Sequence, residues 1–208
     1  MIPFPRPVLI SGAGVGIGRF CAELLAERGA RLFLIDRDVN RCQGVAVATG
    51  GHPVIGDLAE QGTIERAVNA ATLAGGGLSV MIHSISLSDG VDFDAIRAHE
   101  IGAEFETHVA SLLTLSAASL RAMALERNGL LLRIIVEHDQ SPASVRVLQA
   151  AQDAAWSEVG RVAALQNVRV ETLTATPDEL PADVGKRVVE FIDTVFAADA
   201  DPADTETP

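Results

Sequence analysis

Short apolar runs alternate with amphipathic stretches along the whole chain. Strands are predicted over 8–10, 31–35, 53–55, 78–82, 130–136 and 168–173, of which 130–136 is apolar apart from Arg133 and fits a strand that is buried on both faces. The stretches between them have helical periodicity over 19–28, 38–49, 60–73, 92–127, 142–165 and 182–196, with a break expected near Gly102. Strands that alternate with helices through right-handed crossovers predict an α/β fold, a Rossmann-type doubly wound parallel sheet with strand order 3-2-1-4-5-6.

A glycine-rich turn, Ser11 to Gly18, joins the first predicted strand to the first helix. We expect Gly12 to adopt backbone angles that other residues avoid, Gly16 to let a diphosphate approach, and Gly18 to let the helix pack closely on the strand. The free amides and the dipole of the helix then favour an anion. Asp36 ends the second strand about 20 residues later, where an acid accepts hydrogen bonds from a ribose.

The composition places the chain in a broad class. Its 208 residues are 48% hydrophobic and carry a net charge of −12, which predicts one folded domain over 1–198 and argues against a nucleic-acid partner. Residues 199–208 are acidic and small, as in a disordered tail. No run is long enough for a membrane span, and the start lacks a signal-peptide apolar region. Two cysteines suit a reducing compartment, so we expect a cytoplasmic protein.

Histidines are the most conspicuous candidates for a metal or acid–base site. His83, His99, His108 and His138 fall on separate predicted elements without metal-ligand spacing, so no metal is expected. His138 and Asp139 follow the fifth strand together and form the best acid–base pair. The sequence contains no tyrosine, and its only lysine is Lys186.

These features together resemble the short-chain dehydrogenase/reductase family over about 8–196. The turn matches the family's TGxxxGIG motif, with Ser11 in place of threonine and Ile17 as the isoleucine. By this resemblance Gly12, Gly16, Ile17, Gly18, Asp36 and Asp57 are the cofactor-binding residues. Asp36 matches the position that selects NAD over NADP, and Asp57 matches the acid near the adenine amine.

The positions of the family's catalytic Asn, Ser, Tyr and Lys carry other residues. The resemblance places His108 at the asparagine, Gln149 at the tyrosine and Asp153 at the lysine, while the serine falls near Asp139, with Ser141 as a displaced equivalent. In the family a lysine cation lowers the pKa of the tyrosine so that it can transfer a proton near neutral pH. Gln149 has no proton to exchange and Asp153 has the opposite charge, so we expect no catalytic residue in this chain.

The C-terminal part departs from the family as well. The family's Pro-Gly-x-x-x-Thr segment appears as Ala175-Thr176-Pro177-Asp178, without the glycine. The short link that follows predicts that the substrate-covering lid is missing, and no apolar run after Phe196 marks a seventh strand. These losses and the missing lysine predict weak or absent NAD binding.

Three functions fit this pattern. The first is a non-catalytic subunit that pairs with an active NAD-dependent dehydrogenase, or with itself, through helices near 101–127 and 141–165. Leu112 and Leu148 are expected at the centre of that helix bundle, with this chain's own core as the alternative. Family members of this kind act on hydroxyacyl-CoA compounds such as 2-(hydroxybenzyl)succinyl-CoA. The second is an oxidoreductase that uses His138 or Asp139, and the third is a nucleotide-sensing regulator.

Overall fold

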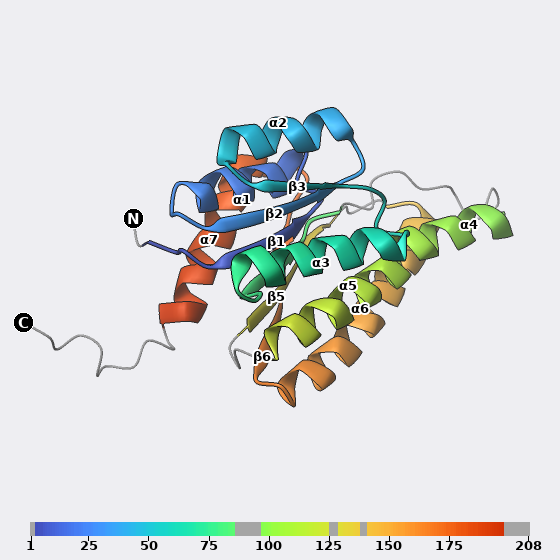
Figure 1. The fold of residues 1–208 in the computed structure, drawn as a ribbon. Coiled ribbons are helices and arrows are strands. Elements are labelled where there is room, and N and C mark those ends of the chain that lie inside the picture. The colour runs from blue at the N-terminus through green and yellow to red at the C-terminus, as the bar shows by residue number, and fades with distance from the viewer. Residues whose placement is uncertain (1–2, 86–96, 125–128, 138–140, 198–208) are drawn as a thin grey trace, which may run out of the picture.

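Six parallel strands form the single sheet of the computed structural model, which describes residues 3–85, 97–124, 129–137 and 141–197 (Figure 1). The strands are β1 (Pro7–Ser11), β2 (Arg31–Asp36), β3 (His52–Ile55), β4 (Val80–His83), β5 (Gly129–Val136) and β6 (Val168–Ala175). Their order is β3-β2-β1-β4-β5-β6, and every neighbouring pair is parallel. The predicted fold class and strand order are therefore confirmed.

Helices cover both faces of this sheet. They are α1 (Gly16–Ala26), α2 (Val39–Thr49), α3 (Gln61–Gly75), α4 (Ala98–Phe105), α5 (Ser111–Met123), α6 (Ala143–Ala164) and α7 (Pro181–Ala197). Residues of α1, α2 and α7 share one apolar core with the sheet, and residues of α3, α5 and α6 share a second core on the opposite face (Figure 1).

The alternation of side chains explains why the central strands β1, β4 and β5 are mainly apolar, whereas the edge strand β6 has exposed polar side chains. In β1, Val8 and Ile10 belong to the α1 and α7 core, while Leu9 between them belongs to the α3 and α5 core. A parallel strand that is buried on both faces has no solvent side for polar residues. Arg133 of β5 is the exception, since it is charged and only 4% exposed.

The long helix before β5 differs from its prediction. Helix α4 continues through the exposed Gly102, and the irregularity lies later, where Glu106–Ala110 form a π-helical turn. A π turn inserts an extra residue without ending the helix, and such turns often occur at functional sites. This one leads into α5 and places His108 in the interior. The predicted ends at 92–96 and 125–127 lie outside the described residues.

Strand β6 forms one edge of the described sheet and runs two residues beyond its prediction. Only residues 176–180 connect it to α7, so no additional helices are inserted at this point. The predicted tail 199–208 lies outside the described residues. Among the helices that the structure describes, none is long and apolar enough to cross a membrane.

Candidate functional site

The glycine turn after β1 adopts a conformation that side chains would prevent. Gly12 has φ +72°, and a Cβ there would lie 2.4 Å from the carbonyl oxygen of Ser84. A Cβ at Gly18 would lie 2.2 Å from the carbonyl oxygen of Gly12, so the turn and the start of α1 are in direct contact. Gly16 has φ +57° and no atom within 4 Å of such a Cβ. The backbone at Gly16 is therefore open to a ligand.

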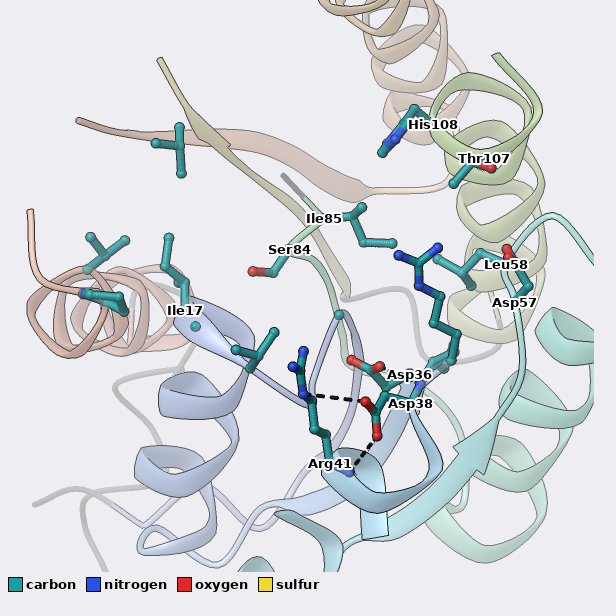
Figure 2. Close-up of a pocket in the computed structure, with 18 of the residues that line it drawn as sticks. Ile17, Asp36, Asp38, Arg41, Asp57, Leu58, Ser84, Ile85, Thr107 and His108 are labelled. Atoms are coloured by element: carbon teal, nitrogen blue, oxygen red, sulfur yellow. Dashed lines mark hydrogen bonds and ion pairs between the residues drawn. The ribbon is translucent and has the colours of Figure 1, made fainter. Parts of the chain in front are cut away.

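Asp36, at the end of β2, is held against this turn. Its Oδ2 accepts a hydrogen bond of 2.8 Å from the amide of Gly14, and its Oδ1 accepts one of 2.9 Å from the amide of Asp38. A carboxylate oxygen has a second lone pair, so both oxygens can accept another hydrogen bond. Asp38 caps α2 through the amide of Arg41 and forms an ion pair with the Arg41 guanidinium at 3.4 Å (Figure 2).

A cleft of about 680 Å³ opens at the carboxyl ends of the strands, above the glycine turn (Figure 2). This is the position where open α/β sheets bind ligands. Charged residues that follow β2 and β3 line one end: Asp36, Arg37, Asp38, Arg41 and Asp57. Apolar residues line much of the other end, near β5, β6 and α7: Val136, Pro177, Pro181 and Val184, with Ile17 from α1.

His108 lies on the wall of the cleft, on the π-helical turn. Its Nε2 is 3.2 Å from Oε2 of Glu104, its Nδ1 has no hydrogen-bond partner among the described residues, and its carbonyl accepts a 2.9 Å hydrogen bond from Nε2 of Gln152. Burial lowers the pKa of His108, although Glu104 opposes that effect. The imidazole is therefore mainly neutral at neutral pH.

Arg133 is bound to α6 behind this wall. Its Nη2 lies 2.5 Å from Oδ1 of Asp153, and its guanidinium carbon lies 5.6 Å from the centroid of the Trp156 ring. The Nε and Nη1 atoms of Arg133 have no hydrogen-bond partner in the described part of the chain. The negative charge of Asp153 is thus balanced by a buried cation on β5.

His83 is paired with Arg133 in the β4–β5 register and is fully buried. Its Nδ1 lies 2.9 Å from Oγ of Ser11. Desolvation lowers the pKa of His83 to about 3, and the positive charges of His108 and Arg133 act in the same direction. His83 is consequently neutral over the physiological pH range.

Thr176 and Glu179, after β6, are bound to each other at the opposite end of the cleft. The amide and the hydroxyl of Thr176 both donate to Oε1 of Glu179, at 3.0 and 3.4 Å. Arg187 of α7 binds Oε2 of the same carboxylate and donates to the carbonyl of Thr174. These contacts close the link between β6 and α7.

Comparison with known proteins identifies the family. The short chain dehydrogenase family model matches residues 6–174, which is most of the chain. The chain belongs to the short-chain dehydrogenase family. A solved metagenomic short-chain oxidoreductase in complex with NADP has the same fold, with a TM-score of 0.80, 21% sequence identity and coverage of 91% of both chains.

Curated relatives agree with this assignment. The chain is 28% identical to the 3-oxoacyl-[acyl-carrier-protein] reductase FabG of Vibrio cholerae over 131 residues, and 26% identical to that of Escherichia coli over 128. These alignments cover 62% and 61% of this chain. They cover 54% and 52% of the two reductases, so the chain spans about half the length of these relatives. An uncharacterized oxidoreductase of Staphylococcus aureus is 24% identical over 94% of this chain and 82% of its own.

The cofactor-binding positions expected from the family gather around one cleft. Gly12, Gly16, Ile17, Asp36 and Asp57 line it, while Gly18 packs beneath the turn. No group of three or more metal-ligating side chains occurs in the described ranges.

The family's catalytic positions are only partly brought together. His108 lines the cleft, whereas Gln149 is half-buried on α6 and Asp153, one turn later, contacts Arg133. His138 and Asp139, the acid–base pair, lie outside the described residues. Ser141, the displaced serine candidate, is half-buried just before α6, and its carbonyl accepts a hydrogen bond from Arg146.

Sequence reasoning did not assign a role to Arg133 or Glu179. Arg133 is the one charged residue in an otherwise apolar strand. Its position indicates that it needs a partner in the interior, but the strand sequence does not specify which residue that is. Glu179 stands among exposed polar residues of the β6–α7 link, where nothing in the local pattern distinguishes it.

Proposed function

We propose that this chain is a non-catalytic short-chain dehydrogenase subunit that pairs with an active, NAD-dependent family member. The observation that carries the proposal is the absence of any tyrosine from the sequence, together with Gln149 and Asp153 at the positions of the catalytic tyrosine and lysine. A neutral amide has no titratable proton near neutral pH, so Gln149 cannot serve as a general acid or base.

The contacts of the neighbouring polar groups support this reading. The Asp153 carboxylate binds Arg133, and the Gln152 amide binds the backbone of His108, so both are engaged in contacts within the fold. A reactive group must be within hydrogen-bond reach of its substrate. These two side chains contribute instead to fixing α6 against the sheet and the π-helical turn.

The outer face of α6 supports a partner subunit. Its exposed small and apolar side chains include Val147, Ala150, Ala154, Ser157 and Val162, and the charged Arg146, Asp153, Glu158 and Arg161 are exposed between them. Protein interfaces combine apolar and polar side chains in this way. Leu112 and Leu148, the residues expected at the bundle centre, are instead 0% and 2% exposed and pack in this chain's own core. That placement was wrong because the largest apolar residues of an amphipathic helix face its own domain.

The cleft would hold the adenosine half of NAD. The open backbone at Gly16 suits the diphosphate, Asp36 suits the ribose hydroxyls, and Asp57 suits the adenine amine. A carboxylate at position 36 disfavours a 2′-phosphate, so we propose NAD over NADP, with low affinity because no lysine stands at position 153. In the partner, the nicotinamide ring of bound NAD would accept the hydride. The residues of this chain would only bind and orient a nucleotide.

The substrate class of the complex is an acyl thioester. The reductases from Vibrio cholerae and Escherichia coli are named for an oxoacyl group on a carrier protein, and heteromeric family members with one non-catalytic subunit act on hydroxyacyl-CoA compounds such as 2-(hydroxybenzyl)succinyl-CoA. The support for this class is the resemblance alone.

Co-purification tests the proposal. The tagged chain, expressed with the catalytically complete dehydrogenases of its host, should recover one of them in a stable complex, and it should show no NAD reduction alone. Val147→Asp places a charge on the outer face of α6, where Val147 is 48% exposed, and should dissociate that complex. Val47→Asp is the matched control, because Val47 is an 86% exposed valine on α2. A monodisperse monomer that captures no dehydrogenase would contradict the proposal.

One observation favours a second candidate, an oxidoreductase with different acid–base residues. His108 lines the cleft, and its Nδ1 is free of hydrogen bonds to the residues that the structure describes. A neutral imidazole can accept a proton at neutral pH. Turnover by the lone chain that is lost in a His108→Gln variant would favour this candidate.

A further inference from the structure

The two ends of the cleft offer different chemistry to a ligand. At the β2 and β3 end, carboxylates and arginines surround the opening, and Ile35 and Leu58 supply apolar surface for a flat base. Toward the β6 end, Val136, Pro177 and Val184 supply apolar surface, and Thr176 and Glu179 are polar. Among the described lining residues, the arginines and most of the carboxylates that could bind a polar, hydroxyl-rich half of a ligand lie at the first end.

The polar groups that do occur near β6 are already bound within the chain. Both donors of Thr176, the amide and the hydroxyl, point to Oε1 of Glu179. Arg187 holds the other oxygen of that carboxylate. The Thr176 amide and Arg187 lower the pKa of Glu179, so the carboxylate carries its charge at neutral pH.

We propose that the cleft takes an adenine nucleotide of the ADP type, and that the contacts among Thr176, Glu179 and Arg187 deprive the second half of a dinucleotide of hydrogen-bond partners at the β6 end. This inference rests on the proposed function, because a subunit that does not react has no need to bind nicotinamide. The adenosine end keeps its open backbone at Gly16.

The Glu179 carboxylate acts in two ways. It occupies the Thr176 amide, which would otherwise be free to donate to a carboxamide oxygen, and its charge disfavours a phosphate nearby. Replacing Glu179 by alanine would free the Thr176 amide and remove that charge, while the Thr176 hydroxyl keeps its hydrogen bond to Asp178. Arg187→Gln releases the carboxylate from the other side and provides a second, independent variant.

Calorimetry on the purified full chain tests this inference with ADP, ADP-ribose, NAD and nicotinamide mononucleotide. We expect the first three to bind with dissociation constants within about threefold of one another, and the mononucleotide not to bind, because the adenosine diphosphate supplies the affinity. Glu179→Ala should tighten NAD binding by about tenfold relative to ADP. Glu190→Ala, at an exposed glutamate on α7, should leave the ratio unchanged.

Three results would overturn the inference: no ADP binding at millimolar concentration, NAD binding more than tenfold tighter than ADP in the unmodified chain, or an unchanged NAD-to-ADP ratio in both Glu179→Ala and Arg187→Gln. The titration needs no partner subunit. Its failure is therefore distinguishable from a failure to recover a dehydrogenase in the co-purification experiment.

Discussion

The substitution Arg133→Met should stabilise the isolated chain. Arg133 is 4% exposed, and two of its nitrogens, Nε and Nη1, lack a protein partner in the described residues. Each buried unsatisfied donor costs about 1–3 kcal/mol. The compensating contacts are an ion pair with Asp153, whose side chain is 54% exposed, and a contact with the Trp156 ring.

These terms set the expected magnitude. An ion pair with a half-exposed partner contributes about 0.2–1 kcal/mol, and a cation–π contact about 0.5–2 kcal/mol. Methionine keeps an apolar stem of similar length in the same space, so no large cavity forms. We therefore expect the free energy of unfolding to rise by about 1–3 kcal/mol, as in other cases where apolar residues replace a buried ion pair.

Urea denaturation of the two proteins at pH 7 measures this difference. The control is Asp153→Asn, which removes the charge partner and keeps Arg133, and which should lower the free energy of unfolding by about 0.2–1 kcal/mol. A loss of more than about 1 kcal/mol in Arg133→Met would show that Arg133 makes stabilising contacts outside the described ones, and it would refute this reasoning.

Three further predictions concern the core, the turn and the old catalytic position. The pKa of His83 is near 6.5 in the unfolded chain and about 3 in the folded chain. The free energy of unfolding should therefore fall as the pH drops below about 6.5, by up to about 1.4 kcal/mol per pH unit, until the pH passes the folded pKa. A His83→Gln variant should show a flatter dependence of stability on pH, and an equal slope would contradict this. Gly12→Ala should lower the melting temperature sharply, because its Cβ would overlap the Ser84 carbonyl; an unchanged melting temperature would show that the turn is free to move. Gln149→Tyr should not create dehydrogenase activity in the lone chain, because Arg133 is held by Asp153 and supplies no free cation; NAD reduction by that variant would contradict this.

The fold was predictable because its signals are local. Most strands are short, mainly apolar runs, and the turn from Ser11 to Gly18 carries the glycines Gly12, Gly16 and Gly18, whose roles follow from backbone sterics. Parallel topology then follows from the alternation of strands and helices. The covering of both faces follows from the same crossovers.

The site was predictable only in part, because its key contacts join distant elements. Arg133 and Asp153 are 20 residues apart on different elements, and Gln152 reaches the carbonyl of His108 from 44 residues away. Such pairs depend on how α6 lies on the sheet, which periodicity does not specify. The π-helical turn at Glu106–Ala110 also has no sequence signal comparable to a glycine or proline.

The most direct test of the central claim is NAD reduction by a reconstituted complex in which the partner's catalytic tyrosine is replaced by phenylalanine. The proposal predicts that the complex assembles and that hydroxyacyl-CoA oxidation falls to background, because this chain supplies no acid–base group of its own. Assembly with turnover that persists, and that is lost on His108→Gln in this chain, would contradict the account and assign catalysis to this subunit.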